Sequence, residues 1–354
     1  MSEATAAERI RRLVDRTIQR SVNGFRYVTS GPPSVGLTPK ETLLERGTLR
    51  LYHYLPQADE LYRVPVLLVM ATTNRGYVFD LAPGQSMVEY LLRQGFDVYL
   101  LDWEAPTQAE RNLDLDAYTQ DFLPSCVEAI AGDCGEPDVS IVGYCMGGVL
   151  SLIYAATHAP GPLKNLACLT TPVNWQGMGL MRQWADPRFF DVDRLVDTLG
   201  IVPEDFVSAA FDMLRPAQKP AGRIRVWEQM WNDEFVRSYR AFDRWGEEML
   251  PLAGAYFRQT TRELMWNNAL YTGELVVGRQ RVDLHQVRVP VMHVTAEHDH
   301  IVSTEASAPL LELVGSEDRA ALVLKGGHVS LIAGPRAVRR MWPALAEWLA
   351  ERST

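Results

Sequence analysis

Apolar residues follow two different periods along most of this chain. Short apolar runs, each long enough for one buried strand, alternate with segments in which apolar residues recur every three or four positions. The expected strands are 64–71, 96–102, 139–143, 163–170, 290–296 and 320–324. The expected helices include 86–94, 116–131 and a C-terminal helix through Trp342, Leu345 and Trp348. This alternation predicts an α/β fold, with a mostly parallel sheet covered by helices on both faces.

Two further patterns precede the first of these strands. Residues 49–54 alternate between apolar and polar side chains, which predicts a strand at an exposed sheet edge. Ile10, Leu13 and Ile18 fall at helical spacing, which predicts an amphipathic first helix with its arginines facing water. Its apolar face has two interpretations, packing on the helix's own domain or docking on a partner subunit.

The α/β pattern stops between residues 172 and 283. Six of the nine tryptophans fall there, in a sequence that favours helices. We interpret the segment as a helical cap inserted over the carboxyl ends of the strands. The expected organisation is therefore an N-terminal helical segment at 1–37, a core made of 38–171 and 284–354, and a cap insertion at 172–283.

Composition and charge exclude several classes of protein. The 354 residues are 47% hydrophobic and 22% charged, as in ordinary globular proteins. A net charge of −9 argues against a nucleic-acid surface, and no apolar run is long enough to span a bilayer. The four cysteines lack C-x-x-C spacing, so neither a zinc site nor a disulfide framework is expected. Cysteines that stay as free thiols predict that the protein is located in the reducing cytoplasm.

The sequence Gly-Tyr-Cys-Met-Gly-Gly at 143–148 carries the strongest chemical signal. It lies between an apolar run and a helical pattern, the strand–turn–helix context of a nucleophile elbow. Its glycines allow the tight turn, because side chains two residues from the nucleophile would collide across it. Cys145 is therefore expected to be a nucleophile, although a buried inert thiol is the ordinary role of a cysteine.

A nucleophilic thiol needs a base and a group that orients the base. Asp299 and His328 each follow an expected strand, and such groups gather at the carboxyl ends of the strands in an open α/β sheet. The chain order Cys145, Asp299, His328 is the order of α/β-hydrolase triads, so we expect an α/β-hydrolase core. A loop-capping aspartate and a core histidine are the alternatives for Asp299 and His328.

Three other histidines lie close together in the sequence near Asp299 and are candidate metal ligands. His293, His298 and His300 lack any further ligand spacing, so neither a metal nor a cofactor is expected. His300 is retained as a secondary residue near the reacting groups.

An acyl carbonyl under attack also needs hydrogen-bond donors for its oxyanion. One expected donor is the backbone N–H of Met146, the residue after the nucleophile. The second is expected from the loop after an early strand, at Thr73 or Asn74. Four basic residues are expected near the site in this topology, where they could bind an anionic ligand: Arg75, Arg258, Arg262 and Lys325. The alternative for each is an ordinary solvated charge on the surface.

From Thr38 to the C-terminus the chain resembles the catalytic subunit of short, two-component (class III) polyhydroxyalkanoate synthases. The landmarks of the resemblance are Thr38-Pro39-Lys40-Glu41, Asn74-Arg75, Tyr77, Asp80-Leu81, Ser86, Asp102-Trp103, the motif at 143–148, Thr171-Pro172-Val173, Asn267-Asn268, Asp299-His300-Ile301-Val302 and Gly326-Gly327-His328. The chain departs from the family pattern at Gly76, Glu104, Asn174 and Ser330.

The resemblance implies that Cys145 accepts the acyl group, that His328 is the general base and that Asp299 is its partner. It implies (R)-3-hydroxyacyl-coenzyme A as substrate, most often the 3-hydroxybutyryl thioester, with polyester and coenzyme A as products. It further implies a second, helical synthase subunit as a partner. A homodimer is the expected oligomeric state, and the surface of polyester granules is the expected location. A cysteine-dependent thioesterase or polyester hydrolase of the same fold, and a non-catalytic scaffold subunit, stay open as alternatives.

Overall fold

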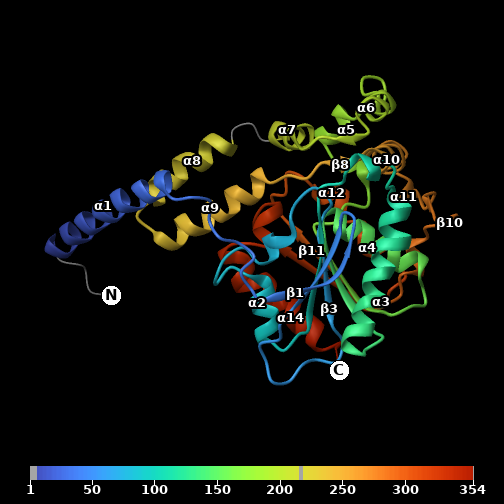
Figure 1. The fold of residues 1–354 in the computed structure, drawn as a ribbon, viewed down its shortest axis with the longest axis horizontal. Coiled ribbons are helices and arrows are strands. Elements are labelled where there is room, and N and C mark those ends of the chain that lie inside the picture. The colour runs from blue at the N-terminus through green and yellow to red at the C-terminus, as the bar shows by residue number, and fades with distance from the viewer. Residues whose placement is uncertain (1–5, 215–217, 354) are drawn as a thin grey trace.

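A single eight-stranded sheet organises the chain, for which a computed structural model describes residues 6–214 and 218–353 (Figure 1). The strand order is β1-β2-β4-β3-β5-β6-β11-β12. Their bounds are β1 Lys40–Arg46, β2 Leu49–Tyr54, β3 Val66–Val69, β4 Val98–Trp103, β5 Val139–Tyr144, β6 Leu163–Leu169, β11 Val291–Ala296 and β12 Arg319–Leu324. β2 is antiparallel to both of its neighbours, and every other pairing in this sheet is parallel. The predicted α/β fold class is confirmed.

The predicted strand at 49–54 is present, but the prediction that it lies at the edge of the sheet was wrong. β2 has those bounds but pairs with β4 on one side and with β1 on the other. β1 is the edge strand on this side of the sheet, and its residues are half-buried or exposed throughout. A strand that buries little apolar surface carries no hydrophobic alternation, which is why the sequence pattern did not reveal it.

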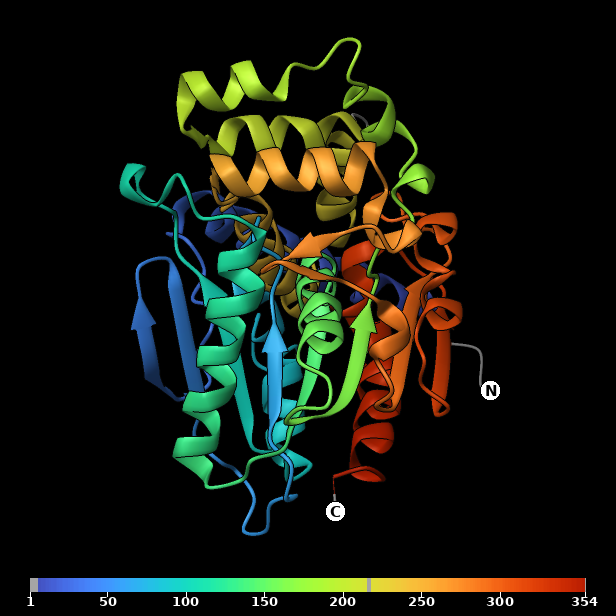
Figure 2. The same cartoon turned by 90° about the vertical axis from the view of Figure 1, so that its right-hand side faces the viewer.

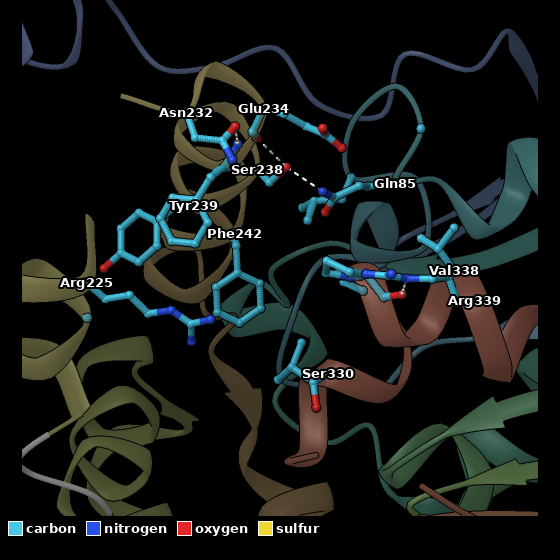
Figure 3. Close-up of a pocket in the computed structure, with 18 of the residues that line it drawn as sticks. Gln85, Arg225, Asn232, Glu234, Ser238, Tyr239, Phe242, Ser330, Val338 and Arg339 are labelled. Atoms are coloured by element: carbon cyan, nitrogen blue, oxygen red, sulfur yellow. Dashed lines mark hydrogen bonds between the residues drawn. The ribbon is translucent and has the colours of Figure 1, made fainter. Parts of the chain in front are cut away.

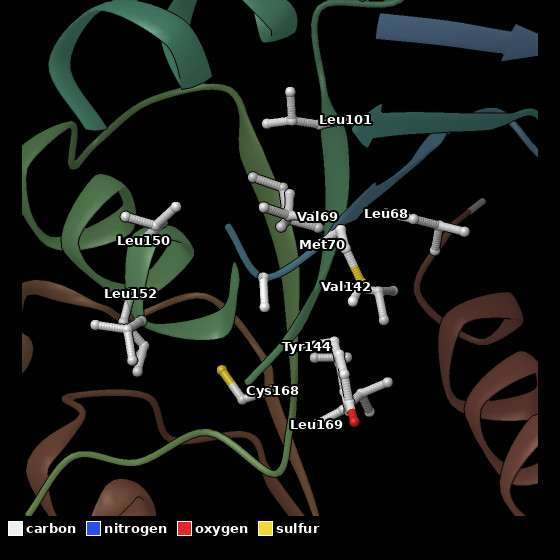
Figure 4. Close-up of a cluster of buried hydrophobic side chains, with 14 of the residues drawn as sticks. Leu68, Val69, Met70, Leu101, Val142, Tyr144, Leu150, Leu152, Cys168 and Leu169 are labelled. Carbon is white, nitrogen blue, oxygen red and sulfur yellow. The ribbon is translucent and has the colours of Figure 1, made fainter. Parts of the chain in front are cut away.

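The centre of the sheet is apolar on both faces. All six residues of β5 and all four of β3 are buried, and they belong to one core cluster with Leu150 and Leu152 of the helix that follows β5 (Figure 4). Continuous apolar runs of this kind are typical of parallel strands with helices on both sides.

Helices cover the two faces of the sheet (Figure 1). α2 (Met87–Arg93) contacts α14 (Trp342–Ala350) on one face, and α3 (Leu123–Cys134) contacts α4 (Met146–Thr157) on the other. The helix expected at 116–131 begins with a π-helical turn at Ala117–Phe122 and continues as α3. It ends at Gly135, whose left-handed φ of 75° caps the helix without a side-chain clash.

The chain between β6 and β11 forms further helices, of which α5, α6, α7 and α10 lie across the carboxyl ends of the strands (Figure 2), while α8 and α9 lie to one side, beside α1 (Figure 1). The helices of this segment are α5 Leu180–Trp184, α6 Val192–Leu199, α7 Glu204–Leu214, α8 Gln218–Gln229, α9 Asp233–Glu247, α10 Gly254–Gln259, the π-helical η5 Thr260–Trp266 and α11 Ala269–Thr272. Two short strand pairs accompany them, β7 (Ile201–Val202) with β8 (Leu252–Ala253), and β9 (Val276–Val277) with β10 (Gln280–Arg281). Pairs of two residues are too short to leave a periodic sequence signal.

The first helix, α1 (Ala6–Thr29), packs beside α8 and α9 through its polar face (Figure 1). Asn23 Nδ2 donates to the Met230 carbonyl oxygen over 2.7 Å, and the Arg16 guanidinium stacks 4.3 Å from the ring centre of Trp231. The opposite face is apolar and exposed, as the exposed fractions of Leu13 (65%) and Phe25 (71%) show. Arg16 stays exposed while its guanidinium makes this cation–π contact, so the expectation that the arginines of this helix face water holds for it.

Among residues 6–214 and 218–353, no helix combines the length and apolarity needed to cross a membrane.

Candidate active site

Cys145 occupies a sharp turn between β5 and α4, with φ 53° and ψ −118°. The turn leaves no room for neighbouring side chains. A Cβ on Gly143 would lie 2.5 Å from the Gly148 Cα, and one on Gly147 would lie 2.2 Å from the Val69 carbonyl oxygen. The predicted strand, tight turn and helix of a nucleophile elbow are therefore present, with the glycines where the backbone requires them.

His328 and Asp299 meet at the carboxyl edge of the sheet, after β12 and β11 respectively. His328 Nδ1 lies 2.7 Å from Asp299 Oδ2. The other carboxylate oxygen, Oδ1, accepts hydrogen bonds of 2.9 Å from the backbone N–H groups of Ile301 and Val302. The carboxylate is thus fixed from both sides, and it orients the imidazole ring.

The imidazole of His328 also hydrogen-bonds the side chain of Cys145. Since Nδ1 faces Asp299, Nε2 is the nitrogen left for the sulfur. Folding therefore brings together all three residues that the sequence analysis selected as nucleophile, base and orienting acid.

Electrostatics favour the charged form of this ring. Burial by itself would lower the pKa of His328, but the negative charge of Cys145 and the hydrogen bonds to Asp299 and Cys145 raise that pKa to about 10. The arrangement therefore favours the protonated ring, the imidazolium, which can return a proton to a leaving group.

The residues proposed for the oxyanion lie in different surroundings. Met146 is the first residue of α4, where backbone N–H groups lack helical partners and point toward the turn. Met146 and Thr73 both line the cavity into which Cys145 opens. Asn74 is buried outside that lining, and its side-chain amide donates to Met249 Sδ over 2.8 Å.

His300 lies beside the loop that carries His328. Its Nδ1 is 3.9 Å from the position that a Cβ on Gly327 would occupy. His300 is therefore a neighbour of the triad, but it does not line the cavity at Cys145.

The cavity above Cys145 has a volume of about 340 Å³, and we refer to it as the cap chamber. Its walls come from the loop at Thr72, from the Asp299 loop at Ile301 and Val302, and from the helices over the sheet. No acidic, basic or amide side chain lines it within the described part of the chain. Its remaining lining residues are Pro172, Trp175, Met178, Met181, Trp184, Ala185, Phe190, Phe206, Val207, Ala210, Phe211, Met213, Leu252, Tyr256, Phe257, Thr260, Thr261 and Met265.

Comparison with known proteins shows the family to which the chain belongs. The family described as "alpha/beta hydrolase fold" matches residues 64–335, and the one described as "Poly-beta-hydroxybutyrate polymerase (PhaC) N-terminus" matches residues 31–91. The PhaC subunit of the poly(3-hydroxyalkanoate) polymerase of Haloferax mediterranei is 34% identical over 98% of this chain and 70% of its own length. The PhaC subunit of Allochromatium vinosum is 33% identical over 90% of both chains. This chain belongs to the PhaC polymerase family.

Solved structures agree on the fold of this PhaC-family chain. A monoacylglycerol lipase of Paleococcus ferrophilus has a TM-score of 0.53 at 16% identity, covering 83% of this chain and 96% of its own. A putative lipase from Sulfolobus solfataricus has a TM-score of 0.54 at 12% identity, covering 91% of this chain and 99% of its own. At such identities the likeness shows the α/β-hydrolase fold alone.

Several landmarks of the PhaC resemblance hold loops rather than face the cap chamber. Asp80 accepts hydrogen bonds from the backbone N–H and the hydroxyl of Thr38, at 2.9 and 2.7 Å. Asp102 accepts from the backbone N–H of Gly76 over 2.6 Å, which fixes the chain after the Thr73–Asn74 loop. Asn268 adopts a left-handed φ of 54° and accepts from the Trp175 backbone N–H over 2.7 Å.

One residue of the site was missed by the sequence analysis. Tyr256 of α10 is buried in the wall of the cap chamber, and its hydroxyl lies 3.3 Å from the Thr72 hydroxyl. Burial and the nearby negative charge of Cys145 raise the pKa of its phenol, so the group stays protonated and can donate a hydrogen bond. No motif marks Tyr256, because its link to Thr72 arises only when the chain folds.

A second cavity, a groove of about 1,200 Å³, lies between α8–α9 and the loop after His328 (Figure 3). Phe242, Tyr239 and Ser330 line it together with Arg225 and Arg339. Gln85 Nε2 donates to Ser238 Oγ across its upper side over 2.5 Å. None of the three triad residues lines this groove.

The candidate cations near the site are largely occupied by carboxylates. Arg75 pairs with Glu104 at 2.6 Å, Arg258 pairs with Asp193 at 3.1 Å, and Arg262 also pairs with Asp193. Lys325 is exposed. Within the described residues, no group of three or more histidine, cysteine, aspartate or glutamate side chains could hold a metal ion.

Proposed function

We propose that this chain is the catalytic subunit of a polyhydroxyalkanoate synthase that polymerises (R)-3-hydroxyacyl-coenzyme A through a thioester on Cys145. The observation that carries the proposal is the contact chain from Asp299 through His328 to Cys145, on the floor of an uncharged chamber. Membership of the PhaC family supports the substrate class, and the 3-hydroxybutyryl thioester is the first substrate to test.

The first step loads the acyl group. Cys145 gives its proton to His328 Nε2, and the thiolate attacks the thioester carbonyl of the substrate. The bond from the acyl carbon to the Cys145 sulfur forms, the bond to the coenzyme A sulfur breaks, and the imidazolium returns its proton to the departing thiolate. Exchange of one thioester for another needs little driving force, which suits a thiol acceptor.

The second step extends the chain. His328 takes the proton from the 3-hydroxyl of an incoming hydroxyacyl group, whose oxygen attacks the acyl carbon on Cys145. An oxoester bond forms, the bond to the Cys145 sulfur breaks, and the sulfur regains the proton from His328. The extended chain is then a coenzyme A thioester, and it reloads onto Cys145 by the first step, with release of coenzyme A. Because an oxoester is less activated than the thioester it replaces, each extension is downhill.

The oxyanion of both steps needs donors close to Cys145. We assign the Met146 backbone N–H as one donor, since it begins α4 directly beside the sulfur-bearing residue. Thr73 is favoured over Asn74 for the second, because Thr73 lines the cap chamber and Asn74 does not. His300 is assigned a supporting position beside the His328 loop.

Water has to be kept from the acyl-enzyme, or hydrolysis would replace polymerisation. We propose the domain division 1–37, 38–171 with 284–354, and 172–283, in which the last segment is a cap that shields the thioester. Helices α5, α7 and α10 supply aromatic and methionine side chains to the chamber, which supports this role.

A direct assay separates this function from the alternatives. Purified protein is incubated with 3-hydroxybutyryl-coenzyme A, and released coenzyme A, free acid and insoluble polyester are measured. Polyester formation with an acyl adduct located on Cys145 by mass spectrometry supports the synthase, and free acid alone would show a thioesterase. A non-catalytic scaffold subunit would release no coenzyme A. The intact triad argues against this alternative, because a scaffold has no physical need of all three residues.

We further propose a second, helical synthase subunit as a partner, with α1 as its docking helix. Ile10, Leu13, Val14 and Phe25 expose more than half of their surface on one side of α1, which supports an interface there. The test compares Ile18→Asn with Arg12→Asn, an exposed position on the polar side of α1. Loss of partner binding and of partner-stimulated activity only in Ile18→Asn supports the proposal. Full activity of the isolated chain, or homodimer formation through α1, would contradict it.

The proposed location is the cytoplasm, at the surface of polyester granules, since an insoluble product accumulates where it is made. Fractionation of cells that accumulate polyester tests this location, and enzyme found only away from granules would contradict it.

A further inference from the structure

We propose that the cap chamber is the passage by which the growing polyester leaves Cys145, emerging between α5 and α7, and that coenzyme A stays outside it. This inference rests on the proposed synthase function. It assigns a role to a cavity and to residues of the helical insertion that the triad does not explain.

The first argument is charge. The residues that line the chamber are apolar or carry only hydroxyl, indole or thiol groups. Coenzyme A carries several phosphate charges, and burying an unpaired charge is strongly unfavourable. An ester chain has no charge along its length, so it fits a chamber in which no cation is present.

The second argument is the kind of side chain in the wall. Five methionines line the chamber: Met146, Met178, Met181, Met213 and Met265. Methionine is unbranched and flexible, so it adapts to ligands whose shape changes. A polyester chain that slides past the wall presents such a changing shape, whereas a single short acyl group would suit a rigid pocket.

The third argument is where the chamber ends. Near the sulfur its wall is buried, since Tyr256, whose phenol lies within reach of the Cys145 charge, is 2% exposed and its neighbour Thr72 is 4% exposed. At α5 and α7 the lining reaches the surface, since Trp184 is 37% exposed and Met213 is 54% exposed. A pocket for one acyl group would end inside the protein. This chamber instead has an apolar rim in contact with solvent.

The direction of synthesis agrees with this path. The carbonyl end of the chain is held by Cys145 in the proposed mechanism, so the older end of the polymer points away from the sulfur. Each extension adds a unit at the sulfur and moves the older units toward the rim at α5 and α7.

A matched pair of variants on α7 tests the passage. Ala210 lines the chamber and has the smallest side chain that α7 contributes to it. Ala209, one residue earlier, is exposed and lies outside the lining. Ala210→Phe places a ring in the passage, and Ala209→Phe adds the same volume on the outer side of the helix.

The measurements separate loading from extension. Ala210→Phe is expected to shorten the polyester far more than it slows acylation of Cys145 or raises the KM for the thioester. Its polyester is expected to be severalfold shorter in mean chain length, while Ala209→Phe gives wild-type polyester. Phe206→Ala, which widens the rim, is expected to keep chains at least as long as those of the wild type.

Two results would overturn the inference. Wild-type chain length from a folded Ala210→Phe protein would show that the chain does not pass α7. A raised KM with unchanged chain length would show instead that the chamber receives the coenzyme. The unmodified protein reports separately on the proposed function, because its failure to make any polyester would reject the synthase itself. If Ala210→Phe does not fold, Ala210→Leu provides the smaller obstruction for the same comparison.

Discussion

His328 Nδ1 lies 2.7 Å from Asp299 Oδ2, and the two side chains are only 4% and 2% exposed. Water is therefore largely excluded from this contact, and the carboxylate is held in place by the Ile301 and Val302 backbone N–H groups. An orienting acid fixed in this way keeps the second ring nitrogen of His328 directed at Cys145.

Replacing the orienting acid tests this relationship. Asp299→Asn keeps the shape of the side chain but removes its charge and favours the wrong imidazole tautomer. In an analogous triad such a change costs about 10⁴-fold in kcat, and we expect a loss of similar order in coenzyme A release. Because Asp299 helps to raise the pKa of His328, that pKa should fall in the variant, which a pH–rate profile would detect. An unchanged rate and profile would contradict the assignment.

Removing the nucleophile or the base should have different consequences. Cys145→Ala is expected to abolish both the acyl adduct and polyester formation, because no other group accepts the acyl chain. His328→Gln is expected to lower the rate by about 10²–10⁴-fold, the usual contribution of a general base. Cys134→Ala, which removes an exposed thiol away from the site, is the control and should leave the rate unchanged. Wild-type turnover by Cys145→Ala would reject the mechanism.

The elbow predicts opposite effects of one substitution at two glycines. Gly147→Ala would place a methyl group 2.2 Å from the Val69 carbonyl oxygen, and we expect destabilisation of about 1–3 kcal/mol with loss of activity. Gly132 lies within α3, and a Cβ added there would have no neighbouring atom within 4 Å. Gly132→Ala should therefore stabilise the protein by about 0.5–1 kcal/mol. Denaturant unfolding measures both values. Equal effects would show that the turn does not exclude a side chain.

His53 predicts how stability depends on pH. Its ring contacts Asp97 at 2.8 Å and Asp133 at 2.9 Å, and the hydrogen bond to Asp97, outweighing burial, raises the pKa of His53. Below the unfolded-state pKa of about 6.5 the ring is charged in both states, so the ion pairs contribute fully. As the pH rises through the higher folded-state pKa, that contribution is lost.

Thermal unfolding across this pH range measures the effect. The melting temperature of the unmodified protein should decline as the pH rises above about 6.5, more steeply than that of His53→Gln. His285→Gln, at an exposed position, should follow the unmodified protein. If the melting temperatures of all three proteins changed with pH in the same way, His53 would not be the cause of the pH dependence.

The sequence predicted most of the central sheet because buried parallel strands are continuous apolar runs, as β3 and β5 show. It did not predict β1, which buries little, or the cation–π contact between Arg16 and Trp231. Those features depend on neighbours distant in the chain, which hydrophobic period alone does not specify.

The residue types and their order at 143–148, 299 and 328 were sufficient by themselves to predict the proposed chemistry, because an elbow and a triad need particular side chains after particular strands. The tertiary structure decided what surrounds that chemistry. Only folding brings Tyr256 beside Thr72, closes Asp299 on His328 and places an uncharged chamber with an exposed rim over Cys145. A linear pattern records which face of an element is buried, but the space between elements is fixed only when they pack together.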